Sequence, residues 1–137
     1  MNKIRERIEK IAQKYDLQVI YAFGSRAKEV LRMVEEKIKR LSFESSDLDI
    51  GIKPRNVLTV EKKVEIALAF EDVFDVPKVD IIILQDAPVF LALEIVTGEL
   101  LYAEDSNLEA EYQLYIMRKA AELIPYERMR QKMILEV

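Results

Sequence analysis

The chain has 137 residues, of which 50% are hydrophobic and 34% charged, and its formal net charge is −4. This length and composition predict one soluble globular domain spanning residues 1–137. The sequence contains no cysteine and no histidine, which excludes disulfides, zinc–thiolate sites, cysteine nucleophiles and imidazole-based serine triads. The acidic balance argues against broad nucleic-acid binding, and we expect no sequence-specific nucleic-acid partner.

The N-terminal stretch 1–15 is charged and amphipathic, without the apolar centre of a signal peptide. The longest apolar runs are too short to span a bilayer. We therefore expect a cytoplasmic protein that does not contact a membrane.

The first part of the chain alternates between helical and strand periodicity. Apolar residues at helical spacing predict a helix within 1–15, and the run LQVIYAF predicts a strand over 17–23. A second apolar stripe predicts a helix over 27–41 with Ser25 as its N-cap. The run DLDIGI predicts a second strand over 47–52.

The second part continues the same alternation. The pattern predicts a helix over 60–74, a strand over 78–84, a short helix capped by Asp86 and ending before Gly98, an edge strand over 99–104, and a long helix over 108–124. Pro125 is expected to bend that helix or to start a new segment, and the tail continues as helix. The order predicts an α+β fold, a small mixed β-sheet flanked by helices, with an extended helix after the Gly24-Ser25 turn.

Two aspartates stand one residue apart at the entrance of the second strand. Residues two apart in a strand point to the same face, so Asp47 and Asp49 project together while Leu48 and Ile50 point into the core. Two carboxylates held this close repel each other unless a cation lies between them. Magnesium prefers such oxygen ligands, together with water and substrate phosphate. The alternative is a solvated acidic turn.

Two further pieces lie at strand ends. Gly24 allows close backbone approach to a bulky anion, Ser25 offers a hydroxyl, and the following helix N-terminus favours phosphate oxygens. The alternative is an ordinary tight turn. Asp80 enters an apolar strand, where a carboxylate needs a partner or a chemical role. It is either a paired aspartate or a third metal-site carboxylate, a position from which it could accept a proton.

The segments FGSRA, SDLDIGI and VDIIIL together resemble the polymerase β-like nucleotidyltransferase superfamily, and more narrowly the minimal nucleotidyltransferases that act as antitoxins of HEPN-domain toxins. The family signature is Gly-Ser, then Asp-x-Asp, then a single Asp on a later strand. In this chain the signature corresponds to Gly24, Ser25, Asp47, Asp49 and Asp80. The segment 86–105 is also similar to the region that follows the third strand in that family.

The resemblance implies a polymerase β-like palm fold and a magnesium-dependent transfer of a nucleoside monophosphate, with manganese as the alternative metal. In the antitoxin subgroup AMP is transferred from ATP to a tyrosine hydroxyl of the HEPN toxin. Carried over, Asp47, Asp49 and Asp80 are the metal-binding and catalytic residues. Gly24 and Ser25 hold the triphosphate, and Arg26 assists with phosphate charge.

One departure from the family lies in residues 26–46, which separate Ser25 from Asp47 by about twice the usual gap. The excess, within segment 28–46, is expected to be added helix that shields the site or contacts a partner. A small-molecule acceptor is the alternative to the toxin. A second alternative is a non-catalytic antitoxin that sequesters its partner through the C-terminal helix, and a homodimer through this surface is a further alternative.

Overall fold

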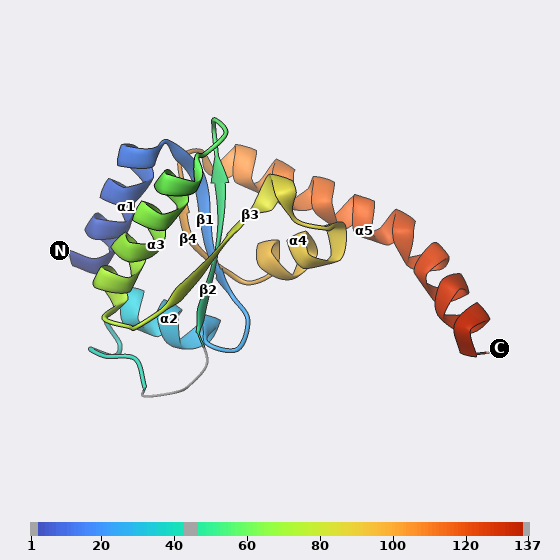
Figure 1. Cartoon of the computed structure of the whole chain (residues 1–137), viewed down its shortest axis with the longest axis horizontal. Helices are drawn as coiled ribbons and strands as arrows, with labels where there is room; N and C mark the ends of the chain where they lie inside the picture. Colours follow the sequence, from blue (N-terminus) through green and yellow to red (C-terminus); the bar gives the residue numbers. More distant parts are fainter. Residues whose placement is uncertain (1–2, 43–46, 136–137) are drawn as a thin grey trace.

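A computed structural model describes residues 3–42 and 47–135 and has a mixed four-stranded sheet at its centre (Figure 1). The strand order is β3-β2-β1-β4; β1 pairs antiparallel with both β2 and β4, and β2 pairs parallel with β3. The elements are α1 (Lys3–Tyr15), β1 (Leu17–Phe23), α2 (Ala27–Val34), β2 (Leu48–Pro54), α3 (Val60–Phe74), β3 (Val79–Ile83), a 3-10 turn η1 (Leu84–Asp86), α4 (Val89–Val96), β4 (Glu99–Ala103) and α5 (Ser106–Leu135). The predicted α+β class with a mixed sheet is confirmed.

Helices cover both faces of the sheet (Figure 1). Helices α1, α2 and α3 lie on one side, and α4 and the first part of α5 lie on the other. Alternate residues of the strands therefore enter two separate cores. Ile20, Ile50 and Ile52 are buried beneath the first group of helices, whereas Tyr21 and Phe23 pack with α4 and α5. Asp49, which lies between Ile50 and Leu48 in sequence, belongs to the second face.

Several predicted elements have the expected bounds. Strand β1 and helix α3 begin and end where the sequence pattern places them. Thr59 caps α3 by accepting a hydrogen bond from the Lys62 backbone N–H at 3.1 Å, and Asp75 ends the helix in a left-handed conformation. Strand β4 lies at an edge of the sheet, as expected.

The extended helix predicted after the Gly24-Ser25 turn is wrong in its length. Helix α2 ends at Val34, because Glu36 adopts a φ of 63° and closes a Schellman motif. In this motif the Lys37 N–H donates to the Arg32 carbonyl at 2.8 Å. Ile38 and Leu41 still pack against the core, but from an irregular segment. Their helical spacing was therefore misleading, and residues 43–46 of the predicted segment lie outside the described residues.

Three smaller expectations about helix ends also differ from the structure. The side chain of Ser25 does not cap α2, whose N-cap position is Arg26. Asp86 lies in η1, and the N-cap position of α4 is Pro88. Of the two alternatives expected for Pro125, a bend or a new segment, the new segment is wrong, because α5 runs through Pro125.

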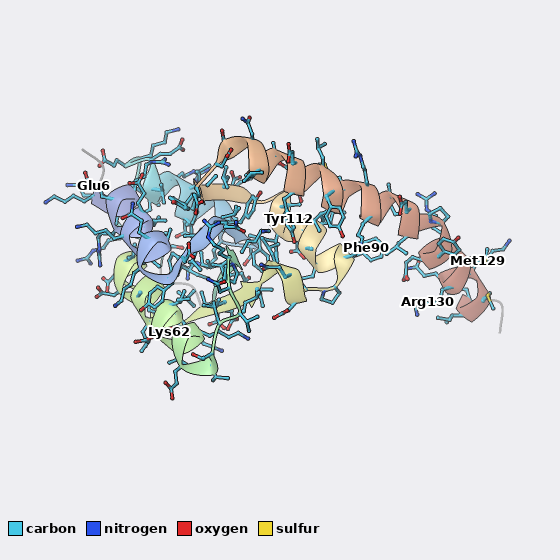
Figure 2. The ribbon with its side chains drawn as sticks, turned by 90° about the horizontal axis from the view of Figure 1, so that it is seen from above. Glu6, Lys62, Phe90, Tyr112, Met129 and Arg130 are labelled. Carbon is cyan, nitrogen blue, oxygen red and sulfur yellow. The ribbon has the colours of Figure 1, made fainter. Side chains whose placement is uncertain are left out.

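The C-terminal part of α5 extends beyond the rest of the molecule (Figure 1), and Met129 and Arg130 lie on this projection (Figure 2). Across the described ranges, no helix combines the length and apolar character needed to cross a membrane.

Candidate active site

The candidate site begins where two neighbouring strands carry carboxylates in register. Asp49 of β2 is the direct partner of Asp80 in the parallel β2–β3 ladder. Residues in register on adjacent strands project to the same face at close distance. The sequence alone placed these two residues on different strands, and the sheet brings them side by side.

The turn after β1 completes one wall of this site. Phe23, the last residue of β1, pairs with Asp49, so the chain turns directly beside that carboxylate. Gly24 makes this turn with a φ of 79°, and a Cβ placed on it would lie 2.5 Å from Asp49 Oδ2. Both the left-handed backbone and the close approach therefore require glycine at this position. The exposed Ser25 follows, and α2 starts at Ala27.

Asp49 is held in an environment that disfavours its negative charge. Partial burial is the main cause that raises its pKa, and the carboxylates of Asp80, Asp47 and Glu94 raise it further. Glu94 lies on α4, which covers this face of the sheet. The site thus gathers more negative charge than the fold neutralises, which is the setting in which a cation is favoured.

Lys78 supplies one positive charge at the outer side of the site. Its Nζ lies 3.4 Å from Asp47 Oδ2 and 3.7 Å from Asp80 Oδ1, and the lysine side chain is 64% exposed. Its pKa is raised, chiefly by the hydrogen bond to Asp47 and the charges of Asp47 and Asp80. Asp47 is thus linked to Asp80 through this lysine. Within residues 3–42 and 47–135, no three acidic groups are already arranged as a metal site.

Arg26 is buried next to the start of α2. Its side chain is 4% exposed and forms an ion pair with Glu29 at 3.6 Å. Its Nη2 donates to the Ser42 carbonyl at 2.8 Å. These contacts tie α2 to the segment that follows it, and the role of Arg26 toward phosphate stays a prediction.

The donor set nevertheless fits a divalent cation. Asp49 and Asp80 present carboxylates on one face, Asp47 stands at the entrance of β2, and the exposed Lys78 lies between Asp47 and Asp80. Hard oxygen ligands of this kind suit magnesium or manganese. The sequence analysis missed Lys78 and Glu94. Lys78 could have been found, because it stands two residues before Asp80 on the same face of the strand, whereas nothing in the sequence placed Glu94 here.

Comparison with protein families identifies the chain. The family described as polymerase beta nucleotidyltransferase matches residues 6–107, which include every candidate site residue. The protein belongs to this family. A search of curated proteins finds no significant match.

Solved structures confirm the nucleotidyltransferase fold. A mutant toxin–antitoxin MntA–HpeT structure is similar with a TM-score of 0.73 at 19% identity, covering 96% of this chain and 98% of that one. A toxin–antitoxin structure with AMP-PNP is similar with a TM-score of 0.72 at 20% identity, covering 96% of this chain and 98% of that one. A structure of a tri-AMPylated Shewanella oneidensis HEPN toxin in complex with MNT antitoxin is similar with a TM-score of 0.69 at 19% identity. The match covers 98% of this chain and 99% of that one.

Proposed function

We propose that this nucleotidyltransferase transfers AMP from ATP to a tyrosine hydroxyl of a HEPN-type toxin and thereby acts as a cytoplasmic antitoxin. The observation that carries the proposal is the in-register pair Asp49 and Asp80 beside the Gly24 turn, within a chain of the nucleotidyltransferase family. The similar folds in a structure with AMP-PNP and in a complex of an AMPylated HEPN toxin support the choice of nucleotide and acceptor.

The chemistry asked of the site is a substitution at the α-phosphorus of ATP. The acceptor oxygen forms a bond to this phosphorus, the bond to the pyrophosphate oxygen breaks, and the acceptor proton is lost. We assign Asp47, Asp49 and Asp80 to hold magnesium, with manganese as a substitute. The ion would neutralise charge on the phosphates. We also assign Asp80 to accept the proton from the acceptor hydroxyl.

Gly24 and Ser25 are assigned to the triphosphate. Gly24 places no side chain beside Asp49, and the next residue, Ser25, is exposed. The backbone N–H groups at the start of α2 follow directly, and a helix N-terminus favours anions. These groups position the phosphate chain relative to the carboxylates, and positioning supplies much of the catalysis in this reaction type.

The test is incubation of the protein with magnesium, a candidate HEPN partner and ATP labelled at the α-phosphate. We expect label on the partner, and loss of that label by at least about a hundredfold in Asp47→Asn/Asp49→Asn. Asp72→Asn is the matched control, because Asp72 is an exposed aspartate of α3 that pairs with Arg7 of α1. These helices cover the face of the sheet opposite to Asp49 (Figure 1). The control variant should label the partner normally.

A second candidate function is sequestration of the partner without catalysis. The observation that favours it is the exposed apolar surface of projecting α5, which includes Tyr126, Met129 and Met133. In that case the double aspartate variant neutralises the toxin as well as the wild type does, and no label is transferred. Label that appears on an added hydroxylated small molecule, and not on the partner, would instead assign the small-molecule acceptor.

A further inference from the structure

We propose that Lys78 is an internal counter-cation that competes with the divalent ion for Asp47 and Asp80, and so sets the metal affinity of the site. This inference rests on the proposed metal-binding role of these aspartates. It concerns regulation of the site by a residue that takes no part in the transfer itself.

Lys78 lies between the carboxylates of Asp47 and Asp80. It stands directly before β3 and two residues from Asp80, so the two side chains leave the same face of the strand. Its Nζ contacts Asp47 Oδ2 at 3.4 Å and Asp80 Oδ1 at 3.7 Å, which places one ammonium between two carboxylates that come from separate strand ends. A cation that binds Asp47 Oδ2 and Asp80 Oδ1 together has to take the place of this ammonium.

The side chains of Lys78, Asp47 and Asp80 are all at least partly exposed to solvent. Asp47 and Asp80 are 36% and 44% exposed, and Lys78 is 64% exposed. A lysine on a flexible stem at this exposure is held by its ion pairs, and exposed ion pairs are weak because solvent screens them. The ammonium can therefore leave without disturbing the core, and the site opens when a competing ion arrives.

Asp49 is surrounded by other negatively charged side chains. Asp49 and Asp80 are paired in register, and Asp47 and Glu94 also act on Asp49. Without a bound ion, this group of carboxylates keeps Lys78 in place as its neutralising charge. With the ion bound, that charge is supplied by the ion. Lys78 thus neutralises part of this charge in the metal-free protein and lowers the affinity of the site for metal.

The test is manganese binding to the full chain, measured by isothermal titration calorimetry at low salt. Lys78→Met removes the ammonium and keeps the length of the side chain. We expect it to bind manganese about three- to tenfold more tightly than the wild type does, because up to two exposed ion pairs no longer compete. The difference should shrink as salt is raised. Lys78→Arg keeps the charge and should remain within about twofold of the wild type.

Lys62→Met is the matched control, because the exposed Lys62 forms a similar ion pair with Glu65, with an Nζ–Oε2 distance of 3.5 Å. Lys62 lies over the ring of Tyr15, next to the end of β1 opposite to the one that pairs with Asp49. This variant should leave manganese affinity unchanged. Equal or weaker binding by Lys78→Met would overturn the proposal, as would an equal gain in Lys62→Met or the absence of binding in both the wild type and Lys78→Met. Transfer of label to a partner is measured separately, so failure of the proposed function is distinguishable from failure of this inference.

Discussion

At the scale of single residues, the site depends on a negative charge that the fold does not favour. Asp49 lies in register with Asp80 and is partly buried, and both effects raise its pKa. A group with a raised pKa contributes its full stability below its ordinary pKa, and that contribution is lost as the pH rises through the shifted value. The apo protein therefore gives up stability at neutral pH in order to keep this carboxylate ionised.

Asp49→Asn should consequently stabilise the apo protein while it abolishes transfer. At pH 7 without divalent ions we expect a gain of less than about 1 kcal/mol in the free energy of unfolding, since like charges no longer stand opposite each other. The gain should diminish as the pH falls through the raised pKa of Asp49 toward the ordinary value of 3.8, because the wild-type carboxyl becomes protonated. Urea unfolding at several pH values measures it, with Asp72→Asn as the control. A less stable Asp49→Asn at pH 7 would contradict the prediction.

Gly24 leads to a second residue-scale prediction. Gly24→Ala places a methyl group against Asp49 Oδ2 at a φ that alanine disfavours, so we expect about 1–3 kcal/mol of destabilisation together with weaker manganese binding. Gly51→Ala is the comparison, because its methyl group would meet Ile95 in the core beneath α4. That variant should lose stability and keep its manganese affinity. Normal manganese affinity in folded Gly24→Ala would refute the close-packing role of the turn.

At the scale of elements, one buried hydrogen bond fastens α5 to the sheet. The hydroxyl of Tyr21, on β1, donates to Glu109, near the start of α5, and both residues are buried. Burial and this hydrogen bond raise the pKa of Tyr21 far above its ordinary value. The pair therefore fixes the orientation of α5 on the face that also carries Asp49.

This pair predicts a loss of stability in alkali. Unfolded tyrosine ionises near pH 10 whereas folded Tyr21 stays protonated, so its contribution is complete below about pH 10 and is lost as the pH rises further. Tyr21→Phe should cost about 1–3 kcal/mol at pH 7, because Glu109 loses its buried donor. The free energy of unfolding of Tyr21→Phe should also fall less between about pH 10 and 11 than that of the wild type. Equal alkaline slopes in chemical denaturation would refute the assignment.

The elements also show what the sequence could and could not predict. Strand β1 and helix α3 were predictable because their patterns are strong, and Thr59 supplies the cap that α3 requires. The end of α2 was not predictable, because Glu36, a residue without the usual preference for positive φ, closes the helix. Ile38 is apolar because it packs against the core from a loop, and its helical spacing after Val34 does not reflect a helix.

The candidate site was predictable in its residue types but only partly in its geometry. The strand period placed Asp47 and Asp49 on one face, yet only the pairing of β2 with β3 brings Asp80 to Asp49. Strand order and register are not encoded locally. The sequence could therefore place Lys78 near Asp80, but the contact of Lys78 with Asp47 and the approach of Glu94 could not be derived. The roles of these residues in metal and nucleotide binding stay predictions.

At the scale of the whole molecule, the chain consists of a compact sheet domain and a helical projection. The residues of α5 beyond Pro125 are largely exposed, and they extend away from the sheet (Figures 1 and 2). The buried contacts of α5, which include Ile116 and Ala120, all precede this part. The projection therefore adds surface and little core.

Removal of residues 125–137 should accordingly change the free energy of unfolding by less than about 1 kcal/mol. Manganese affinity should be unchanged, because the carboxylates lie on β2, β3 and the segment before β2. If sequestration is the function, the truncated protein should bind its partner much more weakly. Thermal unfolding and partner pull-down measure the two effects. A large loss of thermal stability would show that the projection contributes to the core after all.

The edge position of β3 also bears on the size of the acceptor. In the strand order β3-β2-β1-β4, Asp80 lies on an outermost strand and Asp49 on its neighbour. A bulky polypeptide can then reach these carboxylates from the flank of the sheet, without threading between layers of the enzyme. In the proposed transfer to a folded toxin, the surface of the target would then exclude water from these carboxylates.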